Sequence, residues 1–256
     1  MLRIFYADLR NALHNKGFRI ACFTPLFYSG GITILLWVIL KVFLKDGGLT
    51  AEDVLDNYNG LAAFLITAAT MMVFSGDFSN GIIRNKLISG AKRKDVAMSC
   101  ILCGALMGVL LCAVYVVVSV LFVTIFTEGL QMLTIAEAAD SCLVFTLASM
   151  SVGAFSAMLV LVSGGSKISY AIGLVIAFVF KLLNLEVCEK LYPEKGLCAL
   201  QGAKLMLYRG FDRFVPYSHF SLYTRWQFAD YLIGSVVLIV LSLVIGILLF
   251  QKKEIK

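Results

Sequence analysis

The sequence predicts an all-α polytopic membrane protein with six transmembrane helices, and three observations lead to this fold class. Hydrophobic residues make up 60% of the 256 residues and charged residues only 15%, whereas a soluble domain carries about 25% charged residues. The mean hydropathy is +0.91, so lipid must solvate much of the apolar surface. Finally, six apolar runs approach or exceed the length of about 20 residues that crosses a bilayer.

Short polar segments separate the six apolar runs. We expect every run to be a helix, because open strand edges cannot face lipid. The third run is longer than a bilayer requires, which is compatible with a tilted helix. The expected bounds are 20–44, 59–78, 96–127, 141–162, 168–185 and 231–250. The sequence shows no repeat and no soluble region, so 1–256 is expected to be a single transmembrane domain.

An amphipathic helix is expected ahead of the first span. Four apolar residues recur there at helical spacing, namely Leu2, Phe5, Leu9 and Leu13, so they share one face. Asp8 and the other polar side chains are expected on the remaining faces. We therefore expect 1–19 to lie in the membrane interface. The alternative is a basic leader without a further role.

Basic residues are concentrated on one side of the predicted membrane. The segments 1–19, 77–95, 163–167 and 251–256 hold thirteen basic residues against four acidic ones. The short loops on the other side are acidic. The positive-inside rule therefore predicts that both termini are cytoplasmic. The net charge of +6 follows this topology and does not form a soluble basic face, so we expect no nucleic-acid partner.

The segment 186–230 is predicted to be a structured extracellular loop between the fifth and sixth spans. Loops of this length are uncommon without structure of their own, and LCALQGAKLMLYRGFDRF within it could form short helices. We expect it to cap a pathway, and the alternative is a solvated connector. Cys188 and Cys198 lie in or beside this loop, and both a disulfide and two free thiols are compatible with their spacing.

The chemistry expected of an enzyme or an ion-coupled transporter is missing from the spans. Their predicted centres lack Asp, Glu, Lys, Arg and His, the side chains that mark ion pathways. Lys181 is expected near the end of its span. The motif Gly104-x-x-x-Gly108 predicts close helix packing, either within the chain or across a dimer. No residue pattern indicates a nucleotide, metal or catalytic site.

The most specific pattern lies in the loop 79–95. The sequence GDFSNGIIRNKL at 76–87 is followed by Gly90 and by KRK at 92–94, and the chain ends in FQKKEIK. With six spans and an amphipathic first segment, this pattern resembles the permease subunits of type-2 ATP-binding-cassette (ABC) exporters. One departure is that the acidic residue before Gly81 is Asp77, where that family usually has a Glu nearer the glycine.

The resemblance implies that 81–90 is a coupling helix, which docks on a separate ATPase subunit, and that 1–19 is the connecting helix beside it. The implied docking residues are Gly81, Ile82, Ile83, Arg84, Lys86, Leu87, Lys92, Arg93 and Lys94. Topology or lipid binding alone would also account for the positive charge of this loop.

The function implied by the resemblance is that of a non-catalytic exporter subunit in a bacterial plasma membrane. ATP and Mg²⁺ would bind the partner ATPase, with no cofactor on this chain. A second permease subunit, identical or paralogous, would complete the pathway. The apolar spans favour amphipathic cargo, either short peptides such as antimicrobial peptides or hydrophobic drugs. The expected pathway residues on the second span are Thr67, Thr70, Met71 and Phe74.

Two other functions remain open from the sequence. The first is a self-sufficient channel or uniporter that uses the same six spans without an ATPase. The second is a membrane anchor or sensor that does not transport. It would depend on the basic loop and tolerate substitutions in the spans.

Overall fold

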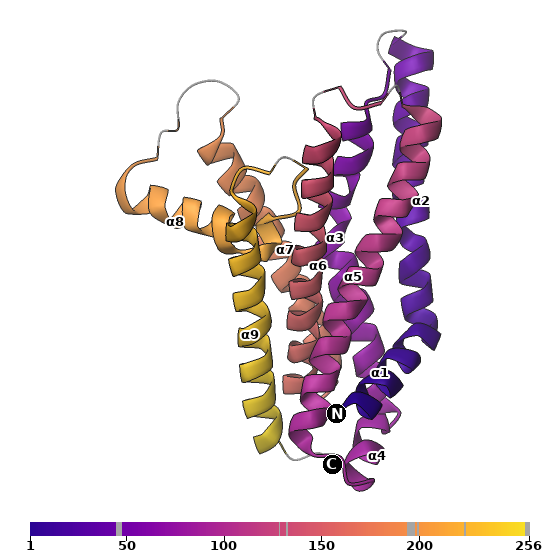
Figure 1. Ribbon diagram of the computed structural model, residues 1–256, viewed down its shortest axis with the longest axis vertical. Helices are drawn as coiled ribbons and strands as arrows, with labels where there is room; N and C mark the ends of the chain where they lie inside the picture. The colour runs from indigo at the N-terminus through magenta and orange to yellow at the C-terminus, as the bar shows by residue number, and fades with distance from the viewer. Residues whose placement is uncertain are drawn as a thin grey trace.

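The computed structural model describes residues 1–44, 48–127, 129–131, 133–193, 198, 200–222 and 224–253, and this part of the chain is a helical bundle without strands (Figure 1). Six of its helices are long and apolar enough to cross a membrane, as predicted. They are α2 (Lys16–Val38), α3 (Ala51–Ser79), α5 (Arg93–Phe126), α6 (Ile135–Ser163), α7 (Lys167–Leu191) and α9 (Phe228–Lys252). The first of them continues into a π-helix, η1 (Ile39–Leu44).

The largest differences from the predicted helix starts are those of α3 and α6, which begin eight and six residues earlier than expected, because each starts with a capping box. In α3 the Thr50 hydroxyl accepts a hydrogen bond from the Asp53 backbone, and the Asp53 carboxylate accepts one from the Thr50 backbone. Thr134 and Glu137 make the same reciprocal pair at the start of α6. Such a box satisfies backbone N–H groups that a helix otherwise leaves unpaired. The polar turns at both starts are therefore helical and project beyond the apolar runs.

The centre of the bundle is the close contact between α5 and α6. A Cβ atom on Gly108 would lie 2.0 Å from the Ser149 carbonyl oxygen, and one on Gly104 would lie 2.7 Å from the Gly153 carbonyl oxygen. Only glycine permits this approach of two backbones. The Gly104-x-x-x-Gly108 motif therefore packs within the chain, which decides between the two alternatives that the sequence left open.

Both termini lie at the same end of the bundle (Figure 1). Two short helices, α1 (Leu2–His14) and α4 (Ile82–Ile88), lie at this end as well. We call it the basic end, because the predicted cytoplasmic segments meet there. The common position of the termini agrees with an even number of spans, while the orientation of this end toward the cytoplasm remains a prediction.

The far half of the bundle carries α8 (Gly202–Phe214), which runs across the long helix axes (Figure 1), and the 3₁₀ turn η2 (Pro216–Ser218). We call α8, η2 and residues 219–222 and 224–227 the cap. The Asp212 carboxylate accepts hydrogen bonds from the Tyr192 hydroxyl and the Trp226 indole, both at 2.9 Å. The cap is thereby fastened to the end of α7. The predicted loop also contains residues 194–197, 199 and 223, which lie outside the described residues.

Cys188 and Cys198 are both free thiols. The Cys188 thiol receives a hydrogen bond from the Arg225 guanidinium at 3.3 Å, whereas the Cys198 thiol donates to the Lys190 carbonyl oxygen at 3.4 Å. The two sulfur atoms thus have different partners, and the structure has two free thiols rather than a disulfide.

Candidate functional site

The N-terminal helix α1 packs against the bundle through a polar as well as an apolar face. Phe5 and Leu9 contact the core, and Asp8, which lies between them in the helix, is only 1% exposed. The prediction that Asp8 faces away from the apolar residues is therefore wrong. The spacing of Asp8 could have indicated its burial. The i, i+3, i+4, i+7 pattern of one helix face is followed by Phe5, Asp8, Leu9 and Ala12.

The carboxylate of Asp8 joins three elements at the basic end. One oxygen makes an ion pair with the Lys86 ammonium on α4. The other accepts a hydrogen bond from the Ser99 hydroxyl on α5. The Asp8 side chain is fully buried and that of Lys86 is 16% exposed. Since a buried charge requires a close partner, this ion pair fixes the position of α4 relative to α1.

A second polar contact lies beside the ion pair. The Asn11 side-chain amide on α1 donates a hydrogen bond of 2.5 Å to Asp77 near the end of α3. Burial alone would lower the pKa of Lys86, but acidic neighbours, with Asp8 in direct contact, outweigh this effect and raise it. Lys86 is therefore charged at neutral pH. The ends of α1, α3, α4 and α5 are connected by one set of polar side chains.

The short helix α4 has a buried side and an exposed side. Ile83 is fully buried against the bundle, Ile82 and Leu87 are half-buried, and Arg84 is exposed. Ile88, which the sequence analysis did not single out, is 73% exposed. The exposure of Ile88 could have been inferred from its position, because it lies four residues after Arg84 and shares a helix face with it.

Glycines bound α4 on both sides. Gly81 precedes the helix with a φ angle of 69°, and Gly90 follows it with a φ angle of 92°. Both angles lie in the left-handed region, where residues with a Cβ are strained. The sharp turns at these positions place the axis of α4 apart from those of α3 and α5.

The basic residues that follow α4 occupy two kinds of environment. Lys92 and Lys94 are exposed. The Arg93 guanidinium donates hydrogen bonds to the backbone carbonyl oxygens of Gln251, at 3.1 Å, and Lys253. Arg93 therefore caps the end of α9. Part of the C-terminal sequence motif, residues 254–256, lies outside the described residues.

The four predicted pathway residues lie inside the bundle in this conformation. Thr67, Thr70, Met71 and Phe74 are each at most 1% exposed. The Thr67 hydroxyl receives a hydrogen bond of 3.3 Å from Ser156 on α6. Met71 lies against Gly173 on α7, where an added Cβ would be 2.1 Å from its Cε. These side chains currently connect α3 to its neighbours.

An apolar pocket of about 230 Å³ lies beneath the cap. The Phe180 ring stacks on Tyr217 with centroids 4.7 Å apart, and Phe155 meets the same tyrosine edge to face. Val237 and Leu241 on α9 line the other side. Aromatic walls of this kind suit an apolar ligand group.

Lys181 lies farther from the end of its span than predicted. The helix α7 continues to Leu191, so ten residues, or about 15 Å, separate the lysine from the helix end. Its ammonium interacts electrostatically with the Asp56 carboxylate on α3. The position differs from the prediction because residues 186–191 extend the helix instead of starting the loop.

Comparisons with known proteins give no closer assignment. No protein-family model matches the chain, and no characterised protein matches it in a sequence search. The fold and the six spanning helices define the class as a polytopic helical membrane protein of the kind found among transporters. Within the described residues, no group of three His, Cys, Asp or Glu side chains could hold a metal ion.

Proposed function

We propose that the chain is the permease subunit of an ABC exporter of type-2 architecture. The observation that carries this proposal is α4, a separate short helix that projects at the basic end and is braced by the Asp8–Lys86 ion pair. The ion pair holds α4 in a fixed orientation relative to α1. A fixed orientation suits a helix that passes on the movement of a partner.

The docking surface of this proposal is the exposed side of the loop 79–95. Arg84, Lys92 and Lys94 supply positive charge, and Ile88 supplies an exposed apolar side chain. An apolar contact with basic residues around it suits a partner groove with an acidic rim. The family resemblance also implies roles for Ile83, Lys86 and Arg93. These residues would not contact the partner directly, because they hold the loop to the bundle.

Movement of the partner would reach the spans through α4. The Asp8–Lys86 ion pair would transmit the movement to α1, and the Asp8–Ser99 hydrogen bond would transmit it to α5. In the proposed cycle, ATP and Mg²⁺ bind two ATPase subunits below two permease subunits, identical or paralogous. Closure of the ATPase pair would shift the equilibrium between two conformations because it binds one of them more tightly.

The proposed setting is a bacterial plasma membrane with the basic end in the cytoplasm. The cargo would be amphipathic, such as a short peptide or a hydrophobic drug. The aromatic pocket beneath the cap supports an apolar group on the cargo. Thr67, Thr70, Met71 and Phe74 would be reached by cargo only in a second conformation that separates α3 from α6 and α7.

Affinity purification of the tagged chain from its native membranes in mild detergent tests the proposal. We expect an ATP-binding subunit to be identified by mass spectrometry with the wild-type chain. The variant Arg84→Glu/Ile88→Glu should lose it, because both changes lie on the exposed side of α4 and leave Asp8–Lys86 intact. A matched control is Lys204→Glu, an exposed charge reversal on α8.

Two outcomes contradict the proposal. If the wild-type chain is recovered alone even after gentle crosslinking, the channel or uniporter function becomes the better explanation. If the ATPase is retained by the double variant, α4 is not the docking helix. A peptide-stimulated ATPase assay on the reconstituted complex tests the cargo separately, and stimulation by small drugs alone would exclude peptides.

A further inference from the structure

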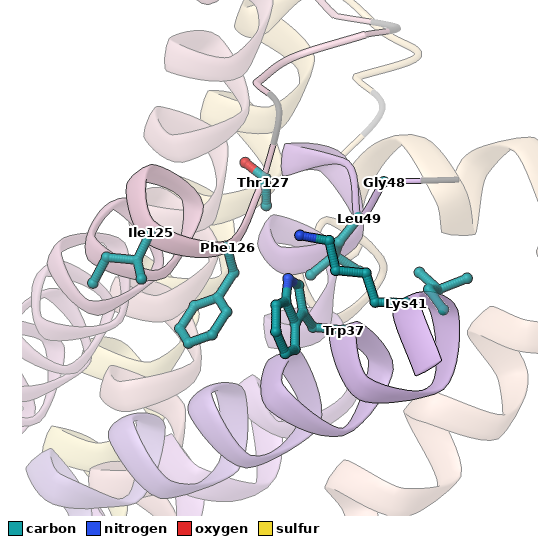
Figure 2. A pocket seen from close by; sticks show the side chains of 8 residues that line it. Trp37, Lys41, Gly48, Leu49, Ile125, Phe126 and Thr127 are labelled. Carbon is teal, nitrogen blue, oxygen red and sulfur yellow. The ribbon is translucent and has the colours of Figure 1, made fainter. Parts of the chain in front are cut away.

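A second pocket lies far from the basic end and has no part in the proposed coupling. It has a volume of about 210 Å³ and lies between the end of α2, the π-helix η1 and the end of α5 (Figure 2). Trp37 and Phe126 form its aromatic wall, edge to face with centroids 5.9 Å apart. Leu49, which is 3% exposed, closes another side.

Two nitrogen donors point into the same space. The Lys41 ammonium lies 5.0 Å from the centre of the Trp37 ring, and Figure 2 shows it on the same side as the indole nitrogen, toward Thr127. In the part of the chain that the structure describes, neither nitrogen has a hydrogen-bond acceptor or a carboxylate partner. The pocket therefore presents a cation and an N–H donor to a ligand that accepts hydrogen bonds.

The length of the helix places this pocket at a definite depth. Lys16 and Lys41 are 25 residues apart along the continuous helical segment, which is about 37 Å at 1.5 Å per residue. The hydrocarbon core of a bilayer is about 30 Å thick, or about 40–45 Å with its polar layers. With Lys16 in one polar layer, Lys41 lies in the other. Trp37 is then at the interface, where tryptophan is enriched.

The backbone at this position is itself unusual. The six residues of η1 form a π-helix, a conformation that is rare and frequently found at functional sites. Leu35 on α2 is 60% exposed, and Ile125 on α5, which lines the pocket, is 70% exposed. A ligand with its charge in the pocket would thus have apolar surface beside it for a hydrocarbon chain.

We propose that this pocket binds the phosphate diester headgroup of an anionic phospholipid in the leaflet opposite to the basic end. Lys41 neutralises the phosphate, the Trp37 indole donates a hydrogen bond to it, and the acyl chains lie along the apolar sides of α2 and α5. The charge of Lys41 and the depth of the pocket select an anionic lipid over a zwitterionic one. The proposal does not depend on an ATPase partner.

Fluorescence quenching by brominated lipids tests the site directly. The chain has two tryptophans, so Trp226→Phe in the full-length protein leaves Trp37 as the single reporter. The protein is reconstituted in phosphatidylcholine vesicles that contain an equal small fraction of brominated phosphatidylglycerol or brominated phosphatidylcholine. We expect the anionic lipid to quench Trp37 about fivefold more effectively, the preference that one basic residue near a lipid phosphate provides.

Three variants in the same background identify the cause. Lys41→Gln should remove the preference, Lys41→Arg should retain it, and Lys204→Gln, an exposed lysine on α8, should leave it unchanged. Circular dichroism verifies that each variant is folded. Equal quenching by both lipids in the parent protein, or a preference that persists in Lys41→Gln, would overturn the proposal. Reversal of the preference by added inorganic phosphate would assign the pocket to a soluble phosphate and overturn the lipid assignment.

Discussion

The Lys86 ammonium on α4 is paired with the Asp8 carboxylate on α1, 78 residues earlier in the chain. The carboxylate is fully buried and also accepts a hydrogen bond from the Ser99 hydroxyl. A buried ion pair contributes little net stability against an apolar replacement, but losing one partner leaves an uncompensated charge. The pair therefore serves best as a constraint on where α4 can lie.

Lys86→Gln should destabilise the protein by about 3 kcal/mol, because the buried Asp8 side chain would lose its charged partner. The measurement is the thermal unfolding of the detergent-solubilised chain by circular dichroism. Lys92→Gln is the matched control, since Lys92 is exposed, and it should change the transition little. In the double variant Asp8→Asn/Lys86→Gln much of the loss should be recovered. A double variant as unstable as the sum of the single changes would mean that the two side chains do not interact.

Gly108→Ala should separate α5 from α6. The added Cβ would lie 2.0 Å from the Ser149 carbonyl oxygen, and backbone atoms cannot move aside without shifting a helix. We expect a loss of about 1–3 kcal/mol and a lower yield of folded protein. Gly76→Ala is the control, because nothing lies within 4 Å of its added Cβ. It should be neutral or stabilising by about 0.5–1 kcal/mol. Equal behaviour of the two variants would disprove the close contact.

Acid should open the cap through His219. Its side chain is 2% exposed and packs edge to face on Tyr231. Burial lowers the pKa of His219 from 6.5 to about 4, against a smaller opposite effect of the Arg213 backbone. The closed cap holds the neutral ring, whereas the opened cap takes up a proton below pH 6.5. The free energy of opening the cap is therefore highest above pH 6.5. It falls as the pH drops toward 4, by about 3 kcal/mol in total.

The pH dependence of thermal unfolding measures this effect. His219→Phe keeps an aromatic ring against Tyr231 and should weaken the dependence between pH 6.5 and 4. The exposed His14 on α1 provides the control, and His14→Phe should leave the dependence as it is in the wild-type chain. An unchanged profile in His219→Phe would show that another group titrates in this range.

Arg93→Leu should loosen the last turn of α9. The guanidinium donates to the carbonyl oxygens of Gln251 and Lys253, and its charge also favours the negative end of the helix dipole. Because the site is partly exposed, we expect a local loss of about 1 kcal/mol. Hydrogen exchange of residues 248–252 should accelerate accordingly. Lys94→Leu, at an exposed neighbour, should not change it, and equal protection in both variants would exclude the capping role.

The spans were predictable because their signal is local. An apolar run of bilayer length has no other stable conformation in lipid, so the six predicted spans agree with the six long apolar helices found among the described residues. The starts of α3 and α6 were also encoded locally, in Thr50-x-x-Asp53 and Thr134-x-x-Glu137. They were missed because hydropathy, which locates the membrane, does not locate the helix ends.

The contacts at the basic end were not predictable in the same way. Arg93 and Lys253 are 160 residues apart, and no local pattern relates an arginine at one helix start to the end of another helix. The sequence grouped all five basic residues of the loop as one surface. In the structure, Lys86 and Arg93 contact the bundle and the other three are exposed. The difference depends on which helices pack beside the loop, and this is a tertiary property.

The distance in sequence between Asp8 and Lys86 also has a consequence for how the protein is made. At about 5–20 residues per second, the 78 residues that separate them take about 4–16 seconds to synthesise. During that time the first two spans must enter the bilayer while the Asp8 carboxylate waits in water without its partner. The amino-terminal helix can therefore reach its final position only after the third span has started to emerge, so biogenesis of this end proceeds in an obligatory order.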